Sequence, residues 1–475
     1  MSRINTNVPA IRAINRLGIN HADLSVRLER LATGLRINHG ADDPAGLITS
    51  ELLRSEMQTI QQAIANSTRA HHVIATAEGA MNELSALLLE LQSLVVEAAN
   101  EAGLTEAEVA ANQLSVDSIL DSIDRIASTT TFAGQKLLDG TRAYILSGVV
   151  PTELASVSIF GALVPNAGSR RVSVRVTQSA QTAQVAFVGT NAGGTSVTSA
   201  TTIEIRGTLG SQLVSFTDNT TLAQVRTAIN DITEMTGVSA VVSSPAIGAA
   251  ASALLLNSIG YGSDAFVSVE PITGDFIEAG NASTTTRGTG VDVAALVNGL
   301  LASGQGLRAD VRSRQLDLRL YLDPTFAQTT STSSFVIAGG GAVFQLAPQV
   351  SPNGQVFVGL APLHSTKLGN SVVGLLYTLR SGLANDLTSQ NFATAQAIID
   401  EAIEQVASQR GRLGSIQRNH IETNISSQQV ALENITASES VIRDADMATE
   451  VSALTRAEVL VQSNQTTLQI ANSIP

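Results

Sequence analysis

A run of apolar residues spaced alternately four and three apart, between Arg69 and Asn100, constrains the fold more than any other feature of this chain. Such an alternation repeats about every 3.5 residues and places the side chains on one face of an α-helix. At about 1.5 Å per residue the helix is roughly 50 Å long, so its stripe needs an equally long partner. The predicted seam consists of Val73, Ala77, Ala80, Leu84, Leu87, Leu91, Leu94 and Ala98.

Composition and charge narrow the class of protein. The chain has 475 residues, enough for roughly two to four domains. Its net charge of −13 argues against nucleic acid or an anionic membrane as a partner. The absence of cysteine excludes disulfides and thiolate metal sites.

The sequence predicts neither a secretory signal nor a membrane span. The N-terminal residues lack an apolar core of secretory length. The stretch from Glu234 to Asp264 is uncharged between its ends, but Pro245, Gly248 and Gly260 interrupt it. We therefore interpret it as strand and turn in a globular domain and expect no membrane contact.

A second apolar stripe lies near the N-terminus, and its helix is predicted to end near Gly34. The stripe positions are again three and four apart: Ile14, Leu17, His21, Leu24, Leu28, Leu31 and Leu35. His21 has no second ligand three or four residues away, so we expect an interface-facing imidazole and not a metal ligand.

The segment after this helix is predicted to be a turn that leads into the next helix. Asn38 and Gly40 favour a turn with positive φ. Asp43 before Pro44 predicts an N-cap with proline at the first helical position. This capping role accounts for the Asp42–Asp43 pair, and no further carboxylates nearby support a cation site.

Residues 44–128 predict long helices in a bundle. A helix from about Pro44 continues into the long seam, and another helix follows a break at Gly103. Thr105 and Glu108 have the spacing of a capping box at the start of that helix. We expect these helices to pack antiparallel.

From about Gly140 the pattern changes from helical to strand-like. Alternating apolar residues replace the heptad, as at Val172, Val174 and Val176. The predicted fold class is therefore α+β, a long antiparallel helical bundle from both chain ends with β-rich outer domains inserted.

Within the insert, residues 201–242 predict a small unit of their own: two strands, a helix capped by Thr220, and a third strand. A further helix is predicted over residues 293–301. Alternating leucines predict a strand over residues 316–322.

The helical pattern returns near Leu368 and continues to the C-terminus. Two offset seams imply a stutter near Gly411 to Gly414. The C-terminal helix is expected to be the partner of the long seam, because closing a large loop adds little entropy. The first C-terminal seam has Ala395, Ile399, Ala402 and Val406, the second has Ile421, Ile425, Leu432, Ile435 and Ile442, and a last amphipathic helix carries Met447, Val451, Leu454, Val461 and Leu468.

No catalytic, cofactor-binding or metal-binding constellation is visible in the sequence. The six histidines have no ligand-type spacing, and the run Gly339 to Gly341 lacks the Lys-Ser or Lys-Thr of a phosphate loop. Neither a Gly-x-Ser-x-Gly segment nor a cysteine nucleophile occurs. We expect a protein that is not an enzyme and uses no cofactor.

Both ends of the chain resemble a known family. Glu29-Arg-Leu-Ala-Thr-Gly-Leu-Arg-Ile-Asn38, followed by Ala41-Asp-Asp-Pro-Ala-Gly46, is similar to the N-terminal signature of bacterial flagellins. Arg410-Gly-Arg-Leu-Gly414 and Ile442-Arg-Asp-Ala-Asp-Met-Ala-Thr-Glu-Val451, continued by Leu454 to Asn472, resemble the C-terminal one. Residues 201–242 resemble a small motif found in flagellin outer domains, and other middle segments resemble no family.

The resemblance implies a filament subunit that is exported unfolded through the flagellar type III apparatus, helped by a chaperone, without a cleaved signal peptide. It then polymerises with copies of itself outside the cell, between hook-junction proteins and a filament cap. As lone helices, the chain ends are expected to be disordered in the monomer. The implied subunit interface consists of Ile14, Leu17, Leu24, Leu28, Leu31, Leu35, Arg36, Asn38, Asp42, Asp43, Met447, Val451, Leu454, Val461 and Leu468.

The resemblance also implies a domain order. Residues 1–43 with 443–475 form an inner core, and 44–177 with 371–442 form the helical bundle. Residues 178–370 form the exposed surface, with a subdomain near 201–243. Flagellins usually continue beyond the Ala-Asn-x-x-Pro segment with a leucine-rich tail; either that tail follows Pro475 or the innermost contacts differ.

One surface that an animal innate-immune receptor recognises in some flagellins differs here. Leu94 matches the family pattern, but Glu90 and Ser115 replace its charged pair. We expect weak receptor recognition. Two alternatives stay open at this point: a hook–filament junction protein, and a flagellin with an adhesive or glycosylated outer domain.

Overall fold

The computed structural model describes residues 7–100, 103–164, 168–188, 196–197, 199–243, 253–274, 277–278, 286–313 and 315–473. The chain divides into two compact units. The first comprises residues 1–72, 344–356 and 415–475, and the second comprises 73–343 and 357–414. The helices are α1 (Val8–Thr33), α2 (Pro44–Ala98), α3 (Glu106–Thr129), α4 (Leu222–Asn230), α5 (Thr233–Thr236), α6 (Pro324–Ala327), α7 (Phe392–Ile416), α8 (Thr423–Arg443) and α9 (Met447–Ser473).

Local signals set several helix ends where they were predicted. Gly34 ends α1 in the left-handed conformation with φ 71°, and Thr105 with Glu108 forms a capping box at the start of α3. Asp43 caps α2, because its Oδ1 accepts the Gly46 amide at 2.9 Å. The prediction of positive φ at Asn38 and Gly40 is wrong, since neither is among the described residues with positive φ.

In the first unit, α8 runs antiparallel to the first part of α2. Ser50 Oγ donates to Glu439 Oε1 at 3.1 Å, and Asn424 Nδ2 donates to Ser67 Oγ at 3.2 Å. A π-helical turn, η5 (Gln417–Glu422), precedes α8. This turn supplies the change of register that the offset seams predicted, a few residues later than expected. Ile421 is fully buried, whereas Ile425, Leu432 and Ile435 are half-buried.

In the second unit, the later part of α2 runs antiparallel to α7. Gln92 Nε2 donates to Asp400 Oδ1 at 2.7 Å, and Arg410 Nη1 donates to Ser85 Oγ at 3.2 Å. The partner of the long seam is therefore α7. The prediction that the C-terminal helix is this partner is wrong, because α9 pairs with α1 instead. The helix α7 buries Ala395, Ile398, Ile399, Ala402, Val406, Gln409 and Leu413.

The buried row of α2 differs in part from the predicted seam. Ala77, Leu84, Leu91 and Ala98 are fully buried as predicted. Between them, the buried residues are Ile74, Met81, Leu88 and Val95, and the predicted Val73, Ala80, Leu87 and Leu94 are half-buried neighbours. Each pair is an apolar doublet, so alternations of four-three and three-four fit the sequence equally well. The helices packed against α2 select the second.

Two β-sandwiches make up most of the second unit. The first stacks the sheet β15-β14-β5-β19-β3 on the sheet β16-β17-β18-β4 around one core. Its strands are β3 (Tyr144–Ser147), β4 (Leu154–Ala162), β5 (Arg170–Gln178), β14 (Ala294–Val297), β15 (Leu300–Leu301), β16 (Ser303–Gln305), β17 (Arg308–Arg312), β18 (Leu316–Leu322) and β19 (Thr332–Gly340). The strands predicted at 172–176 and 316–322 are present, so β structure begins well before residue 178.

The second sandwich is inserted between β5 and β14. It pairs the sheet β12-β6-β10-β9 with the sheet β13-β11-β7-β8, and α4 packs onto its core. Its strands are β6 (Thr182–Val188), β7 (Thr201–Arg206), β8 (Ser211–Phe216), β9 (Val238–Ser243), β10 (Ala253–Tyr261), β11 (Phe266–Thr273), β12 (Ile277–Glu278) and β13 (Thr286–Thr289). The predicted strand–strand–helix–strand order of 201–242 is correct, although Thr221 and not Thr220 caps the helix.

In the second unit, one predicted helix is absent and another begins later than predicted. Residues 293–301 form the hairpin β14–β15, whose two-residue turn Asn298–Gly299 has positive φ at both positions. Asn-Gly is the preferred sequence for such a turn and was the overlooked signal. The helix expected near Leu368 begins only at Phe392. The segment before it forms 3₁₀ turns η3 (Leu376–Leu379) and η4 (Leu387–Ser389) and short strands β22 (Gly369–Asn370) and β23 (Gly374–Leu375).

Short strands complete the description: β1 (Thr131–Phe132), β2 (Gln135–Lys136), β20 (Ala342–Gln345) and β21 (Gln355–Val358), with the 3₁₀ turn η2 (Pro352–Gly354).

The segment 364–390 is hydrogen-bonded to one face of α3. Ser365 donates to Asp124 through its amide at 2.7 Å and its hydroxyl at 2.8 Å. Further along α3, Gln113 Nε2 donates to the Leu379 carbonyl at 2.9 Å.

Candidate assembly surface

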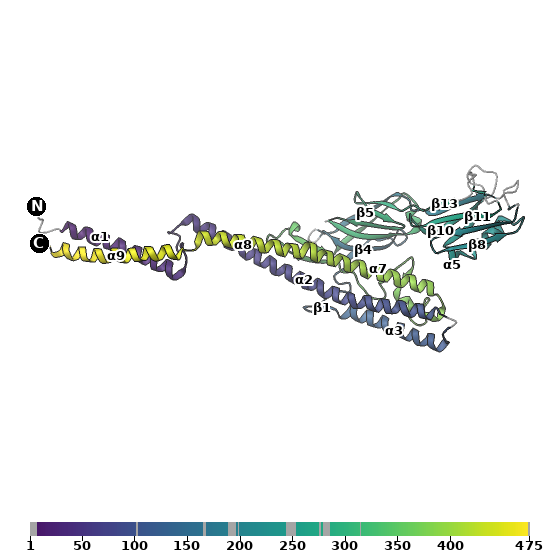
Figure 1. Ribbon diagram of the computed structural model, residues 1–475, viewed down its shortest axis with the longest axis horizontal. Helices are drawn as coiled ribbons and strands as arrows, with labels where there is room; N and C mark the ends of the chain where they lie inside the picture. The colour runs from purple at the N-terminus through teal and green to yellow at the C-terminus, as the bar shows by residue number, and fades with distance from the viewer. Residues whose placement is uncertain are drawn as a thin grey trace. The chain divides into compact units, whose positions relative to one another are not determined.

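The first and last helices of the chain pair with each other in the first unit. They lie side by side and antiparallel (Figure 1). Asn7 Nδ2 donates to the Ala471 carbonyl at 2.9 Å near one end of the pair. At the other end, Glu450 accepts from Arg27 at 3.1 Å and from Arg30 at 3.3 Å. The first and last helices therefore meet, as the sequence predicted.

The buried seam of this pair is narrow and made of small residues. The buried apolar side chains are Ala10 and Ala13 on α1 and Ala457, Val461 and Ala471 on α9. Alanines let two helices approach closely but remove little apolar area from water. Each helix therefore packs only one narrow face against the other, and the pair by itself is only marginally stable.

A carboxylate lies within this seam. Glu450 is 6% exposed and is the first buried residue of α9. Its carboxylate raises the pKa of Arg27 by accepting a hydrogen bond from the guanidinium. A buried carboxylate is tolerated only when it is paired and hydrogen-bonded, and Arg27 and Arg30 on α1 supply these partners to Glu450.

The two connections between the terminal helices and the bundle touch each other. The Arg36 amide donates to the Arg443 carbonyl at 2.7 Å, and Arg36 Nη2 donates to the Ile442 carbonyl at 2.6 Å. In return, the Ala445 amide donates to the Gly34 carbonyl at 2.9 Å. These bonds join the end of α1 to the start of α9.

The loop before α2 is organised by Asp42. Its Oδ2 accepts the amides of Asn38 at 3.0 Å and His39 at 2.9 Å, and these hydrogen bonds hold the pKa of Asp42 below its usual value. Ile37 is 1% exposed beneath this loop. Asp42 and Asp43 are thus occupied by the backbone, as the capping interpretation predicted.

Large apolar side chains remain uncovered on the outward faces of both terminal helices. Their exposed fractions run from 38% to 67% in the described part of the chain. The exposed residues are Val8, Ile11, Ile14, Ile19 and Leu28 on α1, and Met447, Val451, Val459, Leu460 and Ile470 on α9. No helix in the described residues is long and apolar enough to span a bilayer. Within those residues, no cluster of three or more acidic or histidine side chains is arranged to hold a metal ion.

The structure divides the predicted interface residues into two groups. Ile14, Leu28, Met447 and Val451 are exposed. A second group is half-buried or buried in the α1–α9 pair or its connections: Leu17, Leu24, Leu31, Leu35, Leu454, Val461 and Leu468. The first group is available to other molecules, whereas the second mainly joins α1 to α9.

Sequence reasoning missed the residues that define the pair. The predicted stripe of apolar residues does not include Arg27, Arg30 and Glu450. The available signal was position: Ala10, Ala13, Leu17, Asn20, Leu24, Arg27 and Leu31 are spaced alternately three and four apart. Arg27 therefore falls on the inner stripe.

Known proteins match both the ends and the whole of this chain. Residues 4–143 match the bacterial flagellin N-terminal helical region, residues 396–475 the C-terminal helical region, and residues 202–253 the flagellin hook IN motif. The flagellin of Clostridium tyrobutyricum is 28% identical over 474 residues, which cover 99% of this chain and 98% of that protein. The flagellin of Bacillus subtilis is 40% identical over 140 residues, 29% of this chain and 46% of the relative.

Among solved structures, a flagellar hook associated protein-3 from Legionella pneumophila aligns with 82% of this chain and 97% of its own. The identity is 14% and the TM-score 0.31, which is too low to establish a shared arrangement.

The first and last helices of the chain expose apolar faces, and a β-rich insert lies between them in the sequence. These features are typical of a self-assembling structural protein. The chain belongs to the bacterial flagellin family. It is a structural subunit of the flagellar filament.

Proposed function

We propose that the exposed apolar faces of α1 and α9 are the surfaces through which this flagellin polymerises. The uncovered isoleucine, leucine and valine side chains on both helices carry the proposal. Burying one such side chain fully contributes about 1.5–3 kcal/mol, and a filament repeats the contact in every subunit. The α1–α9 seam offers no comparable burial, so assembly supplies most of the stability of these helices.

The test is the double substitution Ile11→Ser and Ile14→Ser, both at exposed positions of α1. We expect the critical concentration for polymerisation to rise about tenfold or more, which corresponds to at least 1.4 kcal/mol. It is measured by sedimentation and electron microscopy of purified subunit across a concentration series.

Asn15→Ser is the matched control, because Asn15 is an exposed polar residue on the same helix. It is expected to leave the critical concentration unchanged. Unaltered polymerisation of the double variant contradicts the proposed surface. The proposal is also contradicted if the native subunit forms no filaments and its residues 1–40 and 445–475 resist protease in dilute buffer.

The domain assignment is part of the same proposal. Residues 1–43 with 443–475 are assigned to the inner core, 44–177 with 371–442 to the bundle, and 178–370 to the outer surface. The helix ends support the first boundary, since α2 begins at Pro44 and α8 ends at Arg443. Limited proteolysis before and after polymerisation tests it, because only core and bundle residues should gain protection.

Export and partners follow from the family assignment as proposals. We propose export by the flagellar type III apparatus with a chaperone, without a cleaved signal peptide, and contact with filament cap and hook-junction proteins. Weak recognition by the innate-immune receptor is proposed from Glu90 and Ser115, both exposed, beside half-buried Leu94. Strong signalling by purified subunit in reporter cells contradicts it.

A further inference from the structure

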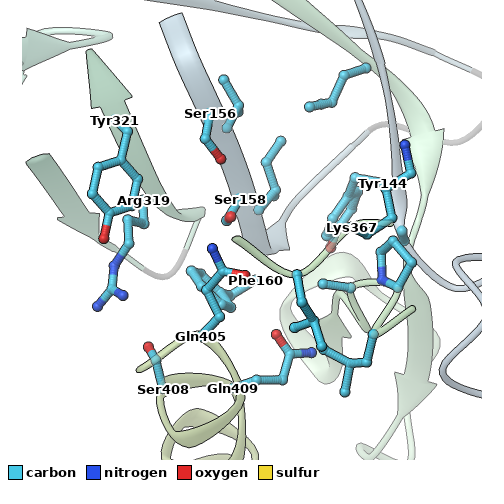
Figure 2. A pocket seen from close by; sticks show the side chains of 18 of the residues that line it. Tyr144, Ser156, Ser158, Phe160, Arg319, Tyr321, Lys367, Gln405, Ser408 and Gln409 are labelled. Carbon is cyan, nitrogen blue, oxygen red and sulfur yellow. The ribbon is translucent and has the colours of Figure 1, made fainter. Parts of the chain in front are cut away.

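The second unit contains a cavity of about 370 Å³, with both polar and apolar lining residues, between the sheet face carrying β4 and β18 and the helix α7 (Figure 2). Ser156 and Ser158 alternate along β4, so their side chains share one face of the strand. On the adjacent strand, Tyr321 pairs with Ser156 and Arg319 with Ser158. The serines are too small to fill the space beneath α7, which leaves the cavity.

The opposite wall comes from one face of α7 and from a fixed turn. Gln405, Ser408 and Gln409 line the cavity at helical spacing (Figure 2). Gln405 is locked in place, since its Oε1 accepts the Gly369 amide at 3.1 Å and its Nε2 donates to the Gly369 carbonyl at 2.8 Å. Lys367 belongs to a turn closed by its amide on the His364 carbonyl at 2.8 Å.

Several polar groups of this cavity have no partner of their own. Among the described residues, no hydrogen bond involves the hydroxyls of Ser156, Ser158 and Ser408, and the ammonium of Lys367, an exposed residue, forms no ion pair. Arg319, by contrast, is neutralised by Asp310 at 3.0 Å and Glu404 at 3.1 Å. Lys367 is therefore the one unpaired cation among the lining residues.

Among the lining residues, the unpaired charge is the positive one of Lys367. The lining residues include Arg319 and Lys367 but no aspartate or glutamate, in a protein whose net charge is −13. One unpaired ammonium matches one negative charge, and free hydroxyls match a ligand that has hydroxyl groups. A cavity of a few hundred Å³ is the size of a small-molecule site.

We propose that this cavity binds a small hydroxylated carboxylate of the size of a hexuronic acid, with its carboxylate on Lys367 and its hydroxyls on Ser156, Ser158 and Ser408. A dianion such as phosphate fits less well, because the second cation is already paired. The site is separate from the assembly surface on α1 and α9, so its failure and that of the assembly proposal are distinguishable.

The chain provides a direct readout, because Lys136 and Lys367 are its only two lysines. The experiment treats the full-length subunit with an amine-acylating reagent and follows both sites by mass spectrometry, with galacturonate as the probe. We expect galacturonate to slow acylation of Lys367 about fivefold, the protection given by roughly four-fifths occupancy. Lys136, whose side chain is 52% exposed, is the internal control and should not change.

Galactose and acetate, at matched ionic strength, separate the parts of the ligand. Each should protect Lys367 less than twofold, because one lacks the carboxylate and the other the hydroxyls. Equal protection by acetate, equal slowing of both lysines, or no protection by galacturonate overturns the proposal. So does protection of Lys367 that appears only in filaments, which assigns the cavity to a side chain of a neighbouring copy.

Ser158→Val fills the cavity and removes one hydroxyl, and it should abolish protection by galacturonate. Ser303→Val is its control, since Ser303 is exposed on β16 of the same sheet. If Ser158→Val does not fold, calorimetric titration of the native subunit decides, with heat from galacturonate and none from galactose expected. Absence of that heat means that the cavity holds water only.

Discussion

At the scale of single residues, the pairing of the chain ends depends most on Glu450. It is the buried charge of a seam otherwise made of small side chains, and it is bound by two guanidiniums of α1. Removing one member of a buried ion pair leaves the others desolvated without compensation. The partial exposure of Arg27 and Arg30 reduces that cost here.

We predict that Glu450→Gln weakens the α1–α9 pair by about 1–3 kcal/mol. Because this pair forms part of each assembled subunit, the critical concentration should rise about five- to hundredfold. Sedimentation of polymerised subunit measures it. Glu458→Gln removes the same charge from an exposed position of α9 and should have no such effect. Equal behaviour of the two variants argues against a specific role for Glu450.

A second residue-scale prediction concerns Glu401 on α7. Burial raises the pKa of Glu401, beside Tyr321 and Gln405. For a carboxyl group whose folded pKa is raised, the folded state binds the proton more tightly than the unfolded state does. Its contribution to stability therefore falls as pH rises from the ordinary glutamate value toward the folded pKa, and stays low above it.

Glu401→Gln removes this titration while keeping the hydrogen bond from Gln405. We expect the variant to be more stable than the native subunit at pH 8, with the difference vanishing below the ordinary value of 4.5. Urea unfolding at a series of pH values measures this. Glu433→Gln, at an exposed position of α8, should show no such pH-dependent difference. A variant less stable than native at pH 8 refutes the argument.

At the scale of elements, α2 shows how a helix selects one of two possible seams. Its apolar doublets place a half-buried residue beside a fully buried one, as with Leu87 and Leu88. A heptad pattern fixes the period of a stripe but not its position when both neighbours are apolar. The helices that pack against α2 decide which row is buried, because their side chains enclose only one of the two rows.

Three adjacent leucines of α2 test this seam. We expect Leu88→Ala to cost about 2–5 kcal/mol of unfolding free energy, because Leu88 is fully buried. Leu87→Ala should cost about half as much or less, because Leu87 is half-buried. Leu89, 57% exposed, should tolerate alanine within about 0.5 kcal/mol. Denaturant unfolding measures the loss of unfolding free energy in each variant. If Leu87→Ala costs more than Leu88→Ala, the seam predicted from the sequence is favoured.

At the scale of the whole molecule, the second sandwich is a self-contained insertion in the first. The chain leaves and returns at neighbouring points, where Gln181 and Val291 exchange backbone hydrogen bonds at 2.9 and 3.0 Å. Each sandwich has its own apolar core. Such an arrangement allows one part to be removed without opening the other.

We predict that residues 182–290 can be replaced by an Asn-Gly turn that joins Gln181 to Val291. The shortened subunit should fold and polymerise with a critical concentration within about threefold of native, less than 1 kcal/mol. Circular dichroism and electron microscopy of filaments provide the measurements. A soluble, folded subunit that forms no filaments places an assembly contact in the second sandwich. Deleting residues 8–33 should abolish filaments and serves as the contrasting case.

Features that depend only on neighbouring residues could be predicted without the structure. Gly34 ends α1, Thr105 and Glu108 begin α3, and the alternation at Val172 to Val176 forms a strand, because a few adjacent residues supply all the required groups. The terminal signatures also identified the family, and with it the filament. The hairpin at Asn298 was equally local, because the Asn-Gly pair that forms its turn is visible in the sequence.

Contacts between side chains far apart in the sequence could not be predicted in this way and became visible in the folded chain. The fold selected Ile74 over Val73, brought Glu450 against Arg27, and placed the exposed Lys367 at a cavity lined by serines from β4 and α7. The physical reason is that burial and charge pairing depend on partners hundreds of residues away, whose positions follow from the packing of whole elements. A local pattern limits the choices for such contacts, and the completed fold selects one of them.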